Sequence, residues 1–133
     1  MKIPSTKVHG VLDYVVSIIV MGSPWLFGFA RGGAETWVPV FIGAAGLAYS
    51  VFTNYEFGLV KQLSMRNHLL LDFSSGVLLA ISPWLFGFSE YVLVPHLILG
   101  ITEILAAAMT DPVPSRTSSS ADGYSGSRPR GAH

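Results

Sequence analysis

The chain contains no cysteine, and few of its side chains carry a charge. Without cysteine it can form no disulfide, no thiolate metal site and no c-type haem attachment. Charged residues make up 12% of the 133 positions, whereas soluble domains carry about 25%. The formal net charge is zero, so the composition gives no reason to expect nucleic acid as a partner. The sequence also offers no nucleophile beside a base, and we therefore do not expect an enzyme.

Apolar residues make up half of the chain, and the mean hydropathy is +0.51. They gather in four segments, at residues 8–29, 37–54, 68–88 and 91–110. As a helix the first segment would reach about 33 Å, enough to cross a hydrocarbon core of about 30 Å. A signal peptide begins in a similar way, but the same pattern returns in mid-chain. The pattern predicts an all-α membrane protein with four transmembrane helices, the last two joined by a tight turn at Ser89 and Glu90.

One seven-residue motif, Ser-Pro-Trp-Leu-Phe-Gly-Phe, occurs at residues 23–29 and again 59 positions later at residues 82–88. Identical heptads in so short a chain indicate an internal duplication. Each copy closes the first of two apolar segments, so each repeat holds two spans. Both repeats then enter the membrane in the same direction, which predicts parallel repeats related by an axis along the membrane normal. The expected divisions are a lead at 1–7, repeats at 8–57 and 68–110, a connection at 58–67 and a tail at 111–133.

The proline of the motif has no amide donor, so Pro24 leaves the carbonyl of Val20 without its usual partner, and Pro83 does the same to Leu79. In lipid such a carbonyl needs another donor, and the preceding serine is well placed to supply one. In an alternative interpretation the serine is an N-cap and the proline begins a new short helix. We favour a continuous, kinked helix. In both cases the motif is expected to be structural, through Ser23, Pro24, Trp25, Ser82, Pro83 and Trp84.

The doubled Ser-Pro-Trp, each copy at the end of the first of two predicted spans, resembles the SPW-repeat family of small prokaryotic integral membrane proteins. The resemblance covers roughly residues 8 to 110. It implies a location in a prokaryotic plasma membrane and a pair of two-span repeats. It implies no activity, and it gives no catalytic residue to transfer.

The basic residues predict the orientation of the four spans. One side of the membrane carries Lys2, Lys7, Lys61, Arg66, Arg116, Arg128 and Arg130, and the other carries only Arg31. Because cytoplasmic loops are enriched in Lys and Arg, both termini are expected in the cytoplasm. The outer face would then carry an aromatic belt, which is typical of a membrane interface: Trp25, Trp37, Trp84 and Tyr91.

A pair of polar residues lies near the start of each repeat. His9 and Asp13 are matched by His68 and Asp72, again 59 positions later. Residues four apart share a helix face, so the two pairs would converge if the first and third helices pack around the axis of the repeat. Two imidazoles and two carboxylates suit Zn, Mn or Fe, and they also suit a proton site. Haem b held by two histidines is a further alternative that leaves the aspartates unexplained.

The same four residues also allow a simpler interpretation. They lie in the first turns of their spans, where side chains can reach water, and aspartate near a helix N-terminus suits the helix dipole. We favour this structural role. The preferred function is therefore a non-catalytic structural or interaction protein without a cofactor. The alternative is a metal- or proton-binding or transport module that uses the duplicated pairs.

The fourth span carries a polar stripe of its own, with His96, Gly100 and Glu103 on one face. Glu103 is the deepest carboxyl group and a second candidate proton or ligand site, together with His96. The structural alternative is a neutral carboxyl group bonded to Thr102, to His96 or to a helix backbone. The first repeat lacks this stripe, since aligning Pro39 with Pro95 places Val40 and Leu47 at these positions. Glu103 is not expected to join the cluster of Asp13 and Asp72.

Two further segments bear on partners. The second span is rich in small residues, which suit either packing within the chain or a dimer seam: Gly43, Ala44, Gly46 and Ala48. Residues 111–133 are rich in Ser, Gly, Arg and Pro and are expected to be disordered. The expected partner is the lipid bilayer, together with a second copy of the chain or other membrane proteins.

Overall fold

The computed structural model describes residues 6–53, 58 and 63–110, which form an all-helical bundle. Its four helices are α1 (Thr6–Leu26), α2 (Ala34–Val51), α3 (Met65–Leu85) and α4 (Val94–Met109). Within these described ranges there is no strand, only an isolated bridge between Thr53 and Leu63. The predicted all-α class is confirmed. The expectations for most of the lead, the last four residues of the first repeat, part of the connection and the tail concern residues 1–5, 54–57, 59–62 and 111–133, which lie outside the described residues.

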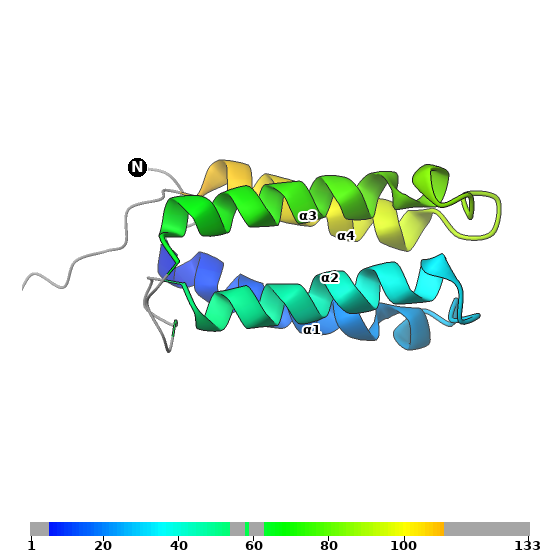
Figure 1. The fold of residues 1–133 in the computed structure, drawn as a ribbon, viewed down its shortest axis with the longest axis horizontal. Helices are drawn as coiled ribbons and strands as arrows, with labels where there is room; N and C mark the ends of the chain where they lie inside the picture. Colours follow the sequence, from blue (N-terminus) through cyan, green and yellow to red (C-terminus); the bar gives the residue numbers. More distant parts are fainter. Residues whose placement is uncertain (1–5, 54–57, 59–62, 111–133) are drawn as a thin grey trace, which may run out of the picture.

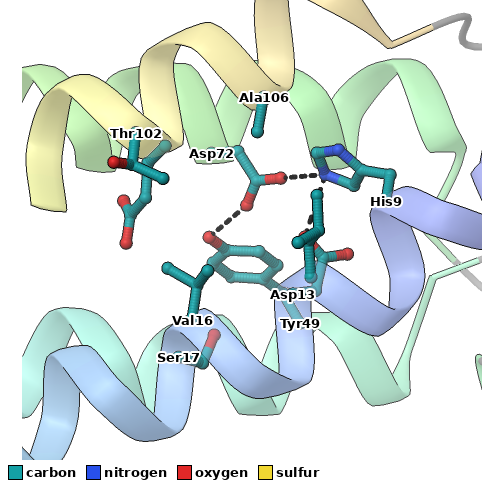
Figure 2. Close-up of a pocket in the computed structure, with 10 residues that line it drawn as sticks. His9, Asp13, Val16, Ser17, Tyr49, Asp72, Thr102 and Ala106 are labelled. Atoms are coloured by element: carbon teal, nitrogen blue, oxygen red, sulfur yellow. Dashed lines mark hydrogen bonds and ion pairs between the residues drawn. The ribbon is translucent and has the colours of Figure 1, made fainter. Parts of the chain in front are cut away.

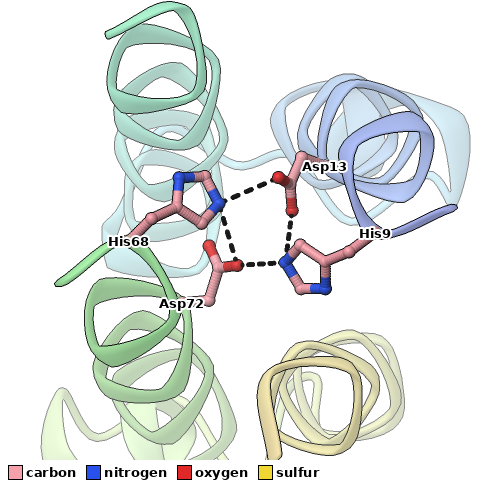
Figure 3. Close-up of side chains that lie close together, drawn as sticks. All are labelled: His9, Asp13, His68 and Asp72. Carbon is pink, nitrogen blue, oxygen red and sulfur yellow. Dashed lines mark hydrogen bonds and ion pairs between the residues drawn. The ribbon is translucent and has the colours of Figure 1, made fainter. Parts of the chain in front are cut away.

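The four helices form two antiparallel hairpins that lie side by side, α1 with α2 and α3 with α4 (Figure 1). Both connecting loops lie at the same end of the bundle, so the two repeats run in the same direction, as parallel repeats require. In addition, α2 packs against α3 and α1 against α4. Seen along the bundle, α1 and α3 therefore occupy opposite corners and face each other across its centre (Figure 3).

The outside of the bundle is apolar and its inside holds many polar side chains, the reverse of a soluble protein. Large apolar side chains such as Phe41 and Leu70 are more than 60% exposed, whereas three histidines are almost fully buried. Helices α1 and α3, with 21 residues each, are long and apolar enough to span a membrane. Helices α2 and α4 are shorter, with 18 and 16 residues.

The duplicated motif forms the C-terminal ends of α1 and α3. Helix α1 continues through Pro24 to Leu26, and Oγ of Ser23 donates a hydrogen bond of 2.8 Å to the carbonyl of Val20. Ser82 makes the equivalent 2.7 Å bond to Leu79. The serine thus supplies the donor that the proline lacks. The continuous-helix interpretation is confirmed, and the N-cap alternative is wrong.

The last residues of the motif stop the helix. Gly28 and Gly87 adopt positive φ angles of 72° and 74°, which only glycine reaches without a steric cost. The next residue, Phe29 or Phe88, then donates its N–H back to the carbonyl of the motif proline, at 2.9 and 2.8 Å. This is the Schellman arrangement, in which an apolar side chain follows the glycine, and both phenylalanines are buried. The motif therefore encodes a complete helix end.

This helix end corrects two predicted boundaries. The connection between α3 and α4 runs from residue 86 to 93, so it is longer than Ser89 and Glu90 alone; glycine stops α3 before the apolar run ends. The turn expected at these two residues is present, since the N–H of Tyr91 donates to the carbonyl of Phe88 at 2.9 Å. At the other end, α3 begins at Met65, inside the predicted connection. There Ser64 is the N-cap and accepts a hydrogen bond from the N–H of Asn67.

Two glycines set the register of the repeats. A methyl group on Gly43 would lie 2.6 Å from the carbonyl oxygen of Ser17, and one on Gly100 would lie 2.6 Å from that of Gly76. Ser17 and Gly76 are equivalent in the two repeats, so Gly43 corresponds to Gly100, at an offset of 57. The predicted alignment of Pro39 with Pro95 is therefore wrong by one residue, because Pro39 lies inside α2 whereas Pro95 lies in the first turn of α4.

The corrected register places Gly46 opposite Glu103 and Pro39 opposite His96, so the stripe on α4 is still not duplicated. Gly43 and Gly46 pack on α1 within the chain. Of the small residues on α2, Ala44, Ala45 and Ala48 are exposed.

Candidate metal centre

The structure brings the two duplicated pairs together at the centre of the bundle (Figure 3). Nε2 of His9 lies 2.9 Å from Oδ1 of Asp13 and 2.7 Å from Oδ2 of Asp72. Nε2 of His68 lies 2.8 Å from Oδ2 of Asp13 and 3.2 Å from Oδ2 of Asp72. Each histidine thus contacts the aspartate of its own helix and that of the other repeat. One ligand atom from each of the four residues lies within 4.8 Å of all the others.

All four side chains are removed from solvent. The side chains of both histidines are at most 1% exposed, and those of Asp13 and Asp72 are 7% and 11% exposed. They point at one another across the bundle and not toward the helix ends (Figure 3). The four side chains therefore do not reach out to water, as the simpler interpretation expected. Buried charged groups need partners, and here each histidine pairs with both aspartates.

Two threonines fix the outer nitrogen of each imidazole. Oγ1 of Thr110 lies 2.8 Å from Nδ1 of His9, and Thr53 makes the same contact with His68. Each hydroxyl donates its proton to a backbone carbonyl four residues earlier. It must therefore accept from Nδ1–H of the imidazole. This leaves Nε2 of each ring facing the carboxylates, and it joins each histidine to a threonine of the other repeat.

The cluster has two electrically neutral states. Two protonated imidazoles balance two carboxylates, and so does a divalent cation bound by two neutral imidazoles and two carboxylates. With Nδ1 protonated, Nε2 either carries a second proton or offers a lone pair. The arrangement can therefore hold protons or a metal ion without net charge, which a low-dielectric setting favours.

A chain of hydroxyl groups leads from the cluster to Glu103. The hydroxyl of Tyr49 donates to Oδ1 of Asp72 at 2.6 Å, and it lies 3.5 Å from Oγ of Ser75. The one proton of the Ser75 hydroxyl can be donated to Oε2 of Glu103, at 3.2 Å, or to the backbone carbonyl of Asp72, at 3.1 Å. The predicted partners of Glu103 are corrected, since Thr102 donates instead to the carbonyl of Ile98. Glu103 stays outside the four-residue cluster, as expected.

His96 lies apart from both Glu103 and the cluster. Its Nε2 lies 3.0 Å from the backbone carbonyl of Glu35. Its ring packs between Phe29 and Phe88, with centroids 5.0 and 4.8 Å away. These two phenylalanines close the two copies of the motif, so His96 fills the space where the helix ends meet. The stripe predicted on α4 therefore divides into two separate environments.

A cavity of about 40 Å³ lies beside the cluster (Figure 2). Three cluster residues border it, and Glu103 lies on its wall together with Thr102 and Ala106. A porphyrin does not fit in this volume, so the geometry gives no support to haem ligation. No sequence motif singles out Thr53, Thr110, Tyr49 or Ser75. The one available signal is that Thr53 and Thr110 also lie at the repeat offset of 57.

The comparisons with known proteins agree with the duplication. The family model of the SPW repeat domain matches residues 7–110, whereas no curated protein and no solved structure matches the chain. The match covers both hairpins and both copies of the motif, and the family is membrane-associated. This chain therefore belongs to the SPW repeat family.

Proposed function

We propose that this chain is a non-catalytic membrane protein in which a divalent transition-metal ion, bound by His9, Asp13, His68 and Asp72, joins the two repeats. The observation that carries the proposal is the convergence of four buried donor atoms within 4.8 Å. Two donors come from each repeat, so a bound ion would fasten the hairpins across the centre of the bundle.

The donor set fits such an ion. Imidazole and carboxylate groups bind Zn, Mn and Fe. Donor atoms bound at about 2.1 Å in a tetrahedral arrangement lie about 3.4 Å apart, so a pair now separated by up to 4.8 Å would close by up to about 1.4 Å, a shift within reach of side-chain rotation. Metal-binding histidines usually donate their other N–H to an acceptor, and Thr53 and Thr110 supply those acceptors.

A second candidate follows from the same distances. The contact of 2.7 Å between Nε2 of His9 and Oδ2 of Asp72 is typical of a charge-assisted hydrogen bond, and the other contacts between Nε2 and a carboxylate oxygen, at 2.8 to 3.2 Å, are ion pairs when the rings are protonated. Two imidazolium rings and two carboxylates would then hold the repeats together without a metal. This alternative keeps the structural role and changes only the cation.

The proposal includes a membrane topology in which all four helices cross the plasma membrane and both termini are cytoplasmic. Lys7 and Arg66 lie in the first turns of α1 and α3, at the end that holds the cluster. Arg31 lies in the loop at the opposite end, and Trp25 and Trp84 are more than half exposed there. This asymmetry of basic and aromatic residues supports the orientation.

The test is the metal content of full-length protein purified in detergent. The protein is incubated with Zn²⁺, Mn²⁺ or Fe²⁺, freed of excess ion by gel filtration and measured by mass spectrometry. We expect about one ion per chain. The ion should be lost in His9→Ala/His68→Ala and in Asp13→Asn/Asp72→Asn, which keeps the side-chain volumes. His96→Gln is the control, since this histidine is as buried but lies outside the cluster. If the wild-type protein takes up none of the three ions, the metal site is refuted and the proton-bridged cluster is the explanation that remains.

A further inference from the structure

The two halves of the cluster differ in one residue. Tyr49 and Ala106 occupy equivalent places, because each lies four residues before the threonine that bonds a histidine and accepts that threonine's hydrogen bond. On the first side the Tyr49 hydroxyl donates to Asp72 at 2.6 Å. On the other side Ala106 offers only a methyl group, and it borders the same cavity as Asp13. The chain thus closes one flank of the cluster with a phenol and leaves the other flank open.

The cavity lies on this open flank (Figure 2). His9, Asp13 and Asp72 border it, and Ala106 and Glu103 form part of its wall. Roughly 10–15 Å³ of such space holds one water molecule, so its volume of about 40 Å³ admits a few waters or an anion of two or three atoms. The lining is not wholly apolar, since Glu103 and the Tyr49 hydroxyl offer hydrogen bonds to an occupant.

We propose that a metal ion at the cluster keeps an open coordination position on the side of Ala106, and that a small exogenous ligand enters there. The ligand is water, or a small inorganic anion that replaces it. Four protein ligands complete a tetrahedral site, whereas Zn²⁺ can expand to five ligands and Mn²⁺ prefers six, and the added position binds water or another small molecule. Glu103 is the group that accepts a hydrogen bond from a bound water. This inference rests on the proposed metal site.

The test uses full-length protein loaded with Co²⁺, whose visible absorption reports its coordination. Azide is the probe, because it is a three-atom anion. We expect azide to change the cobalt spectrum of the wild type along a saturable curve. Ala106→Phe fills the cavity and should weaken the azide response at least tenfold while one cobalt ion stays bound. Ala108→Phe places the same ring on the exposed face of α4 and should behave like the wild type.

The possible outcomes separate the two proposals. Wild-type protein that binds no cobalt refutes the metal site itself. A cobalt spectrum that azide leaves unchanged refutes the open position alone, and so does an equal response in the wild type and in Ala106→Phe. Should Ala106→Phe fail to fold, Ala106→Leu fills less of the cavity, and it should still weaken the response several-fold.

Discussion

Replacing Thr53 or Thr110 with valine tests how the cluster is organised. Valine keeps the shape of threonine but removes the hydroxyl that accepts Nδ1–H of one histidine. That N–H would then be buried without a partner, which costs about 1–3 kcal/mol. Loss of such an orienting group lowers metal affinity about 10- to 100-fold, or roughly 1.4 to 2.7 kcal/mol. Because the two threonines make equivalent contacts in the two repeats, we expect the two variants to lose similar affinity.

The assay is a competition titration of zinc-loaded protein in detergent with a chelator of known affinity. Thr102→Val is the matched control. Its hydroxyl also donates to a carbonyl four residues earlier, but it is exposed and touches no histidine. The control should bind zinc as the wild type does. Equal affinity in all four proteins, or an equal loss in the control, would refute the orienting role of the threonines.

Three further predictions concern the packing and the charge of the bundle. Gly43→Ala should lower the free energy of unfolding by about 1–3 kcal/mol, since its methyl group would meet the backbone of α1. Gly22→Ala is the control, because its methyl group would have no atom of a neighbouring element within 4 Å and should not lower the free energy of unfolding. Thermal unfolding of both variants is the measurement. Ser82→Ala should cost about 1 kcal/mol, because it leaves the carbonyl of Leu79 unpaired; Ser74→Ala, at an exposed helix position, is the control in the same assay. Loading with a divalent ion should release two protons per ion if the cluster stays neutral, and a pH indicator in weak buffer would detect fewer if it does not.

Features repeated at a constant spacing could be predicted from the sequence. The motif and the His–Asp pairs recur at one offset, so the two hairpins, their common direction and the meeting of the pairs follow from a single duplication. The role of the motif serine was also predictable, because a proline inside a helix creates a defined need for a donor. Whether the cluster holds a metal ion or two protons is decided by the metal assay.

Contacts between distant residues could not be predicted. Thr110 bonds His9 across 101 positions of the chain, and threonine at a helix end carries no sign of such a partner. The two prolines predict the wrong register of α2 against α4, because the close approach of Gly43 and Gly100 to the neighbouring helices decides it. Local composition also failed at Gly87, where backbone conformation ends the helix although apolar residues continue.

The exchange of threonines between the repeats has a consequence for how such a site can be assembled. Each hairpin supplies half of the donors and the hydroxyl that orients the other hairpin's imidazole. Two separate hairpins would have to find each other at a rate set by their concentration, whereas the fused chain holds them at a high effective concentration. Fusion also allows the two hairpins to differ in sequence. A dimer of identical hairpins would carry tyrosine on both flanks or alanine on both, so the pairing of Tyr49 with Ala106 requires two halves of different sequence, which the fused chain holds in a fixed ratio of one to one.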